Sequence, residues 1–369
     1  MPTADNSIAV IVSCQSERAI ECDRWPVRRG RTLCVMILAA DVGGTSSRLA
    51  VFDVDGGALR LVSEQRYANR EHRGLDEIVR AFQSSHSQPV DRASFAVAGP
   101  VMGGRVQTPN LPWTVEAPAL ARALGLPGVS LLNDLEANAH GIPALETKDL
   151  LTLNAGSPAG DGNQAVISAG TGLGEAGIYR RGGRAHPFAG EGGHTSFAPS
   201  TELEVELLLF LRRKVGAHVS WERVVSGPGL VSIYEFLRDT GRGAEPTWLA
   251  DAMRAGDPSA VISEAAQEGK SELCAQALSL FVSAYGAEAG NLALKVLAIG
   301  GVFVGGGIAP KILGALTQGA FMQAFVNKGR LRGLLEGIPV QVILNDGAAL
   351  LGAARWTALQ PAESAASRP

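Results

Sequence analysis

A glycine-rich turn early in the sequence has residues that could hold a phosphate group. It follows Asp41 and contains Gly43, Gly44, Thr45 and Ser46. Glycines without a Cβ let backbone N–H groups converge on an anion, and the two hydroxyls add further donors. Asp41 would hold Mg²⁺ beside it, through water, because Mg²⁺ keeps much of its hydration shell. An ordinary hairpin with glycines at positive φ would use the same residues, so this turn alone does not establish a phosphate site.

Two more turns of similar composition follow. The second consists of three glycines and a threonine around one leucine: Gly170, Thr171, Gly172 and Gly174. The third consists of Gly305, Gly306 and Gly307. Pro310 comes shortly afterwards, where the first turn of a helix is expected. Small residues at this third turn would let a flat ring lie against the backbone. Each turn has an ordinary structural explanation, but three in this order favour a nucleotide site.

A candidate acid–base group lies between the first two turns. Asn133 and Asp134 stand where the apolar strand 129–132 gives way to the helical segment 135–140. A carboxylate at the rim of a sheet would accept the proton of an attacking hydroxyl group. Asp is also a standard N-cap residue. Capping and catalysis do not exclude each other, so both interpretations of Asp134 stay open.

Glu191 and His194 form a second polar cluster, held in a run of glycines at 190–197. Such side chains offer the acceptors and donors that neighbouring hydroxyl groups of a sugar require. A single histidine is more often structural, and metal ligation is disfavoured because no second His or Cys lies at ligand spacing. Glu222 precedes another Gly/Pro turn at 226–229, where it reads equally well as a solvated acid at a helix end.

The elements that must position these residues form an α/β pattern. Three β-rich runs at 36–41, 48–53 and 58–64 are separated by glycine turns and predict an antiparallel meander. Predicted helices (75–82, 116–124) and strands (93–98, 129–132) follow it. The order strand, Gly/Thr turn, strand recurs at 165–179, which indicates a duplicated, two-lobed fold. Later helical segments are predicted at 202–214, 229–239 and 271–296, so the second lobe is expected to be helix-rich.

Composition narrows the functional classes. The 369 residues suit about two domains. A net charge of −3 without a basic stripe disfavours nucleic acid and anionic membranes as partners. Three of the four cysteines lie within the first 35 residues and the fourth is Cys274, which gives no disulfide framework or zinc spacing. We therefore expect a reducing, cytoplasmic location.

Two common nucleotide-binding motifs are absent. The sequence has no Gly-x-x-x-x-Gly-Lys-Ser/Thr loop, and no Gly-x-Gly-x-x-Gly opens a helix after the first strand. P-loop and Rossmann folds are thereby disfavoured. Two hairpin phosphate turns in two lobes favour the actin/hexokinase/Hsp70 architecture, a ribonuclease H-like fold of duplicated βββαβα units with a cleft between the lobes.

Six motifs, in this order, resemble those of the bacterial glucokinase family: Asp-Val-Gly-Gly-Thr at 41–45, Leu-Asn-Asp at 132–134, Ala-Gly-Thr-Gly-Leu-Gly at 169–174, Gly-Glu-Gly-Gly-His at 190–194, Glu-Arg-Val-Val-Ser-Gly-Pro-Gly at 222–229 and Gly-Val-Phe-Val-Gly-Gly-Gly-Ile at 301–308. The resemblance covers about residues 36–359. Ser46 stands where the family usually has Asn, which shortens one hydrogen-bonding side chain. The zinc motif Cys-x-Cys-Gly-x-x-Gly-Cys of the other sugar-kinase family with this architecture, which also includes repressors, is absent.

The resemblance implies transfer of a phosphoryl group from ATP, with Mg²⁺, to the 6-hydroxyl of glucose, the first step of glycolysis. It implies that Asp134 is the general base. The residues implied around the sugar are Asn110, Asn133, Asp134, Glu191, His194 and Glu222. The first two glycine turns would hold the phosphates, and Gly305, Gly306 and Gly307 the adenosine. Family members are typically cytoplasmic homodimers.

The same resemblance implies a division of the chain. We expect a small α/β domain at 36–143 with a returning C-terminal helix at 347–360, and a large α/β domain at 144–346. Residues 1–35 and 361–369 are expected to be a poorly ordered extension and a loose tail.

Three alternatives remain open at this stage. A kinase for another hexose, such as mannose or fructose, would have the same motifs, and ADP or polyphosphate could replace ATP as the donor. A non-enzymatic sensor of the same fold is a different class of protein. It is disfavoured because residues 1–35 show no helix-turn-helix and only about ten residues follow the fold, too few for the peptide-binding domain of an Hsp70-like switch.

Overall fold

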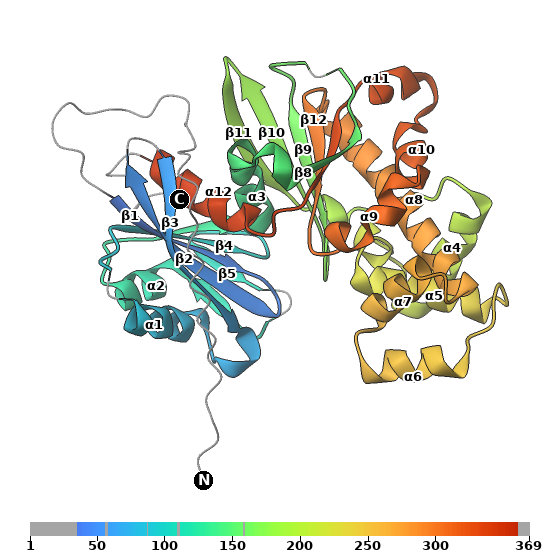
Figure 1. Cartoon of the computed structure of the whole chain (residues 1–369), viewed down its shortest axis with the longest axis horizontal. Helices are drawn as coiled ribbons and strands as arrows, with labels where there is room; N and C mark the ends of the chain where they lie inside the picture. Colours follow the sequence, from blue (N-terminus) through green and yellow to red (C-terminus); the bar gives the residue numbers. More distant parts are fainter. Residues whose placement is uncertain (1–34, 56–57, 87, 109–110, 158, 361–369) are drawn as a thin grey trace, which may run out of the picture.

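The computed structural model describes residues 35–55, 58–86, 88–108, 111–157 and 159–360. Two β-sheets lie next to each other, each with its own helices, and the chain passes between them (Figure 1). The predicted extension at 1–35, apart from Val35, and the predicted tail at 361–369 lie outside the described residues, as does Asn110. None of the helices in the described ranges is both long and apolar enough to cross a membrane.

The first sheet has the strand order β3-β2-β1-β4-β7. Its strands are β1 (Val35–Val42), β2 (Ser46–Asp55), β3 (Ala58–Ala68), β4 (Arg92–Val97) and β7 (Ser130–Asn133). β1, β2 and β3 form the predicted antiparallel meander, while β4 is parallel to β1 and β7 is parallel to β4. A short hairpin of β5 (Arg105–Gln107) and β6 (Thr114–Glu116) stands apart from this sheet.

The second sheet repeats this arrangement. Its strand order is β11-β10-β9-β12-β13-β8, and its strands are β8 (Leu150–Asn154), β9 (Gln164–Ala169), β10 (Leu173–Arg181), β11 (Arg184–Gly190), β12 (Gly301–Gly305) and β13 (Val340–Ile343). β9, β10 and β11 are antiparallel, and β12 and β13 follow in parallel, as in the first sheet. β8 adds an antiparallel edge. The matching order and directions confirm the predicted duplication and the two-lobed α/β fold.

Alternating side chains along β1 separate the two faces of the first sheet. Leu38 and Ala40 belong to one buried cluster, which includes residues of α1 (Leu75–Ser85) and α2 (Ala117–Leu124). Ala39 points to the opposite face and packs with residues of α12 (Ala348–Leu359). This period of two is what a sheet covered on both faces requires. The side chain of Asp41 therefore lies on the face covered by α12.

The second lobe is helix-rich, as the sequence predicts. Its helices are α4 (Glu202–Val215), α5 (Gly227–Asp239), α6 (Thr247–Ala255), α7 (Pro258–Gln267), α8 (Glu272–Val296), α9 (Leu313–Thr317), α10 (Ala320–Val326) and α11 (Arg332–Glu336). The long helix α8 contributes Phe281 and Tyr285, which are fully buried in the main core cluster. The Tyr285 hydroxyl donates to the carbonyl oxygen of Gly305 at 3.1 Å and thereby ties α8 to the end of β12.

Two helices connect the lobes (Figure 1). Leu135 of α3 (Asp134–Gly141) packs with residues of β9 and β10 in the second sheet, while Ala137 of the same helix belongs to the cluster of the first sheet. α3 crosses α12 at very close range. A Cβ on Gly141 would overlap the carbonyl oxygen of Ala348, and a Cβ on Gly352 would overlap that of Ala137. The crossing fixes both helices beside the space between the two lobes.

Candidate active site

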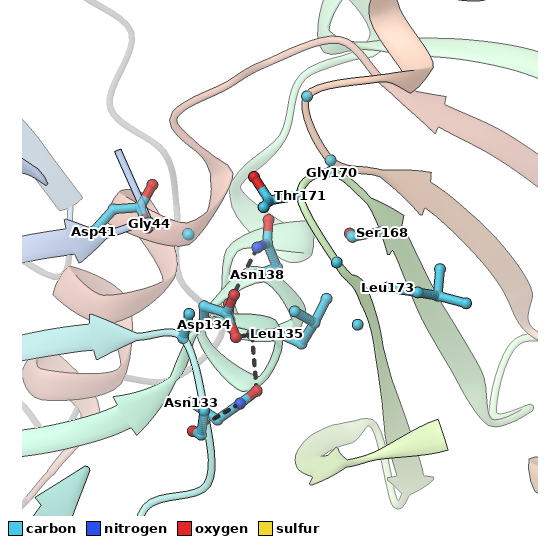
Figure 2. A pocket seen from close by; sticks show the side chains of 18 of the residues that line it. Asp41, Gly44, Asn133, Asp134, Leu135, Asn138, Ser168, Gly170, Thr171 and Leu173 are labelled. Carbon is cyan, nitrogen blue, oxygen red and sulfur yellow. Dashed lines mark hydrogen bonds between the residues drawn. The ribbon is translucent and has the colours of Figure 1, made fainter. Parts of the chain in front are cut away.

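A cavity of about 740 Å³ opens between the two lobes and brings together residues from distant parts of the sequence. Figure 2 shows Asp41 on β1, Asp134 at the start of α3 and Thr171 between β9 and β10, all around one space. Most of the predicted site residues line this cavity: Asp41, Gly43, Gly44, Asn133, Asp134, Gly170, Thr171, Gly172, Gly174, Glu191, His194, Glu222, Gly306 and Gly307. Thr45, Ser46 and Gly305 are not among the lining residues.

The first glycine turn is held by the buried side chain of Asn69, which was not among the predicted site residues. The Gly43 N–H donates to the carbonyl oxygen of Ser46 at 3.0 Å. From η1 (Asn69–Glu71), the Asn69 Nδ2 donates to the Gly43 carbonyl oxygen at 2.7 Å, and the Ser47 hydroxyl donates to the Asn69 Oδ1 at 2.7 Å. Neither Gly43 nor Gly44 has positive φ, so the alternative of a hairpin that needs glycine for its dihedral angles is wrong.

The second turn is held by Glu222. Its Oε2 accepts a hydrogen bond from the Leu173 N–H at 3.2 Å, and the Gly170 carbonyl oxygen accepts one from the Gly227 N–H at 2.8 Å. A Cβ on Gly172 would lie 2.5 Å from the Glu222 Oε2, so a larger residue there would displace the carboxylate that holds the turn. A Cβ on Gly170 would meet nothing within 4 Å. The open side of Gly170 therefore faces the cavity.

The third turn follows β12 and leads into η6 (Ala309–Ile312), in which Pro310 occupies the first helical turn as predicted. Gly306 has φ of +83°, and a Cβ there would overlap the Ala169 carbonyl oxygen, so the fold itself requires glycine. Gly307 has open space around it. Gly305 lies within β12, where a Cβ would press on the hydroxyl oxygen of Ser168. Gly305 thus packs against Ser168 within the sheet and does not face the cavity.

Asn133, and not Asp134, is the N-cap of α3, which corrects the capping interpretation of Asp134. The Asn133 Oδ1 accepts from the backbone N–H groups of Leu135 and Glu136 at 2.9 and 3.2 Å, and its Nδ2 donates to the Gly99 carbonyl oxygen at 3.1 Å. The Asp134 Oδ1 shares the Leu135 N–H at 3.0 Å. Asp134 is therefore the first residue of the helix, and its carboxylate lines the cavity (Figure 2).

The two aspartates have unusual proton affinities. Burial, with a smaller contribution from the charge of Glu191, raises the pKa of Asp134 to about 6, although the hydrogen bond from the Leu135 N–H opposes the shift. Burial also raises the pKa of Asp41 to about 6, and the charge of Asp134 adds to the effect, while Arg48 and Arg66 oppose it. Perturbed carboxylates that face one cavity are typical of active sites. A group with a pKa near 6 is well suited to accept a proton at neutral pH.

The polar cluster of Glu191 and His194 is built on a short turn, η4 (Gly192–His194). The His194 Nε2 lies 3.8 Å from the Glu191 Oε2, and both side chains are more than half exposed toward the cavity and solvent. A Cβ on Gly193 would overlap the Leu173 carbonyl oxygen. The turn can therefore sit tightly on β10 only because it lacks a side chain there, and this contact fixes the positions of Glu191 and His194.

The donor set at the first turn fits Mg²⁺ held mainly by phosphate and water. No cluster of three or more His, Cys, Asp or Glu side chains suited to a metal ion is present in the described part of the chain. Asp41 and Asp134 repel each other across the cavity, and a divalent cation near Asp41 would relieve that repulsion. One carboxylate together with substrate phosphates is a usual environment for Mg²⁺.

Several lining residues were not predicted. Asn138 lies one helical turn after Asp134 and donates through its Nδ2 to the Asp134 carbonyl oxygen at 3.1 Å. Its spacing of four residues on a predicted helix could have revealed it. Arg66, Ser168 and Lys311 also line the cavity. Each depends on strand register or loop course, and the sequence carries no signal for either.

Known proteins similar to this chain include several glucokinases. The family model described as Glucokinase matches residues 38–360. A glucokinase of Nostoc sp. is 42% identical over 334 residues, which cover 86% of this chain and 98% of the relative. The crystal structure of a glucokinase from an Antarctic psychrotroph has a TM-score of 0.74 and 31% identity, and covers 87% of this chain and 98% of that one. A ROK family glucokinase from Streptomyces griseus, solved with glucose and AMPPNP, has a TM-score of 0.59 and 25% identity, and covers 87% and 99%.

Proposed function

The chain belongs to the glucokinase family, and on that premise we propose which of its residues bind the substrates and carry out the reaction. The reaction is the ATP-dependent phosphorylation of glucose. We propose that the acceptor is the 6-hydroxyl and that the product is glucose 6-phosphate, formed as the first step of glycolysis. The observation that supports this assignment best is the carboxylate of Asp134, which faces two glycine turns across one cavity.

In the proposed mechanism Asp134 is the general base. The oxygen of the sugar hydroxyl attacks the γ-phosphorus, the bond from that phosphorus to the β,γ-bridging oxygen breaks, and ADP leaves. The hydroxyl proton passes to the Asp134 carboxylate. Asn133 positions this carboxylate by capping α3 and by anchoring to Gly99. A positioned base contributes roughly 10²- to 10⁴-fold to the rate, so orientation and charge stabilisation supply the larger share.

Glu191, His194 and Glu222 are proposed to bind the sugar hydroxyls, with Asn110, which lies outside the described residues, as a further candidate. The three described residues line the cavity. Glu222 also accepts from the Leu173 N–H, so it would connect the sugar site to the second phosphate turn. A sugar bound there would thus influence the turn that holds the phosphates.

The nucleotide is proposed to lie along the three glycine turns. The first two turns, including Thr45, Ser46 and Thr171, would hold the phosphates. The third turn, Gly305 to Gly307, would hold the adenosine, with the open side of Gly307 facing it. Asp41 would hold Mg²⁺ through water. When bound, that ion would neutralise charge on the phosphates.

We further propose that the domains are 36–143 with 347–360, and 144–346, and that they close on the sugar. Closure would exclude water, which otherwise competes as the phosphoryl acceptor. The crossing of α3 and α12 at Gly141 and Gly352 supports this division, because both helices touch the junction of the lobes. By family resemblance we propose a cytoplasmic homodimer.

A comparison of kcat/KM for glucose, mannose and fructose tests the substrate assignment, with ATP, ADP and polyphosphate compared as donors. Glucose with ATP is expected to give the highest value. A higher value with another hexose would assign the enzyme to that sugar. No phosphorylation of any hexose would favour the non-enzymatic alternative.

A further inference from the structure

Three charged residues form a row across the first sheet. Asp41 of β1 is paired with Arg48 of β2, and Arg48 is paired with Arg66 of β3. Residues directly opposite each other in neighbouring strands project from the same face of a sheet. All three side chains are therefore on the face covered by α12. The row runs from Arg66 on the edge strand β3 to the Asp41 carboxylate beside the first glycine turn.

A fourth charged residue, Asp346, contacts this row. Asp346 lies between β13 and α12, where the chain returns to the first sheet. The Arg48 guanidinium donates to the Asp346 Oδ1 at 3.0 Å, and the Arg66 guanidinium donates to the Asp346 Oδ2 at 3.1 Å. The two arginines thus share one carboxylate at the junction between the lobes.

The environments of the two arginines differ. The Arg48 side chain is 19% exposed and is also paired with Glu64, so two carboxylates hold it in place. The Arg66 side chain is 60% exposed, forms an ion pair with Asp346 and lines the cavity. The Asp346 side chain is itself 72% exposed, so its pairing with Arg66 is weak. Arg48 is built into the sheet, whereas Arg66 can change partner at little cost.

Arg66 is also close enough to the reaction site to influence it. Its positive charge lowers the pKa of Asp41 against the opposing effects of burial and of Asp134. Neighbouring strands lie about 4.8 Å apart, so two strand spacings separate Asp41 from Arg66 by about 10 Å at the backbone. An extended arginine side chain reaches across most of that distance, toward the phosphate turn at Gly43 and Gly44.

We propose that Arg66 is a further catalytic residue, whose guanidinium leaves Asp346 and contacts the transferring phosphoryl group in the closed enzyme. The inference rests on the proposed assignment of the cavity as the kinase site. Charge spreads over the equatorial oxygens of the phosphoryl group in the transition state, and the planar guanidinium donates to two such oxygens at once. Arg66 stays protonated throughout, so the attacking oxygen, the leaving ADP and the proton taken by Asp134 still balance the step.

The first test is Arg66→Gln, compared with Arg60→Gln. Arg60 is a matched control because it lies on the same strand, pairs with Asp53 at 2.6 Å and is not among the residues that line the cavity. In Arg66→Gln, kcat with glucose and ATP should fall about 10²- to 10³-fold, as for loss of one transition-state donor. The KM for glucose and the Tm should stay unchanged. Arg66→Lys should recover only part of kcat, because lysine keeps the charge but lacks the paired donors.

A second measurement separates direct contact from a role through Asp346. Affinity for ADP with aluminium fluoride, in the presence of glucose, should fall in Arg66→Gln by about the same factor as kcat, while affinity for ADP alone changes little. Asp346→Asn should lower kcat less than Arg66→Gln, and Arg66→Gln should still lower kcat in the Asp346→Asn background. If Asp346→Asn reproduced the whole loss and the double variant were no slower, Arg66 would act only through Asp346 and the inference would be overturned.

The outcomes also distinguish this inference from the proposed function. If the wild-type enzyme and Arg60→Gln phosphorylate glucose and Arg66→Gln does so equally fast, only the role of Arg66 is overturned. If the wild-type enzyme phosphorylates no glucose, the proposed function fails, and the role of Arg66 fails with it.

Discussion

The amide of Asn133 caps helix α3 and leaves the carboxylate of the next residue, Asp134, to line the cavity between the lobes. Both residue types can cap a helix, but only Asp134 can also accept a proton, so the two adjacent residues divide these tasks. Capping by Asn133 determines where α3 begins, and this start determines the position of the Asp134 carboxylate. Because the partial positive charge of a helix N-terminus stabilises an anion, Asp134 can remain ionised at neutral pH in spite of its burial.

The pH dependence of the reaction should reflect this burial. Burial raises the pKa of both Asp134 and Asp41 to about 6. A general base acts in its unprotonated form, so kcat/KM for glucose should be constant above pH 7 and fall below about 6, approaching about tenfold per pH unit. Initial rates at saturating ATP over pH 4.5 to 8.5 measure this. A limb with its midpoint near the ordinary aspartate value of 3.8 would contradict the assigned environment.

Asp134→Asn should make the protein more stable at neutral pH. Since the folded-state pKa of Asp134 is raised, the folded protein binds more protons than the unfolded chain between about pH 4 and 6, and stability falls as pH rises through that window. Above it, the cost of burying the charge is fully present. The variant should therefore melt at least about 2 °C higher at pH 7.5, with the gain vanishing near pH 4 in calorimetric scans.

Asp251→Asn is the matched control for that measurement. Asp251 is an exposed carboxylate on α6 that pairs with Arg254, and such surface pairs contribute little to stability. Its Tm should change little at either pH. Equal gains in both variants would mean that net charge, and not burial of Asp134, determines the effect.

Two glycine-to-alanine changes should separate ligand binding from folding. Gly170→Ala adds a methyl group to open space, so the Tm should be unchanged, whereas the KM for ATP should rise at least about tenfold if phosphate occupies that space. Gly306→Ala places a side chain at φ of +83° against the Ala169 carbonyl oxygen and should lower the Tm. Thermal melts and ATP titrations of both variants measure this. An unchanged KM for ATP in Gly170→Ala would remove that glycine from the phosphate site.

Asn69→Ala should loosen the first phosphate turn. It removes the hydrogen bonds to the Gly43 carbonyl oxygen and from the Ser47 hydroxyl, so the KM for ATP should rise about 10- to 100-fold. Asn154→Ala is the control, because the Asn154 side chain also makes two hydrogen bonds, from its Nδ2 to the carbonyl oxygens of Glu336 and Ile338, and Asn154 does not line the cavity. Both variants should lose stability, and only Asn69→Ala should change the kinetics with ATP. An equal change in both would assign Asn69 a purely structural role.

Much of the fold follows from local sequence patterns. The meander, the strands that lead to Asp41 and Asp134, and helix α8 were predictable because apolar periodicity and glycine turns mark them directly. β3 extends to Ala68, beyond the predicted end at residue 64, because pairing with β2 continues through polar residues that carry no apolar signal. The sequence predicts that a strand-turn-strand unit recurs, but it does not predict the strand order of the two sheets, because pairing between distant strands has no local sequence signal.

Site residues could be predicted where the local sequence marks them, but not where the pairing register of distant strands brings them to the site. The glycine turns and the acidic residues that line the cavity stand out by composition. The sequence does not decide whether Asn133 or Asp134 is the N-cap, because both residue types favour that position. Asn69 and Arg66 reach the site through a buried bridge and a cross-strand row, which only the three-dimensional pairing of β1, β2 and β3 creates.

The most direct test of the account is the turnover of Asp134→Asn. Formation of glucose 6-phosphate is followed in a coupled assay, and glucose binding is measured by calorimetry on the same preparation. With Asp134 as the base, kcat falls at least about 10²-fold, while the dissociation constant for glucose stays within about tenfold of the wild-type value. Turnover near the wild-type rate would contradict the account, because the proton of the sugar hydroxyl would then have another acceptor.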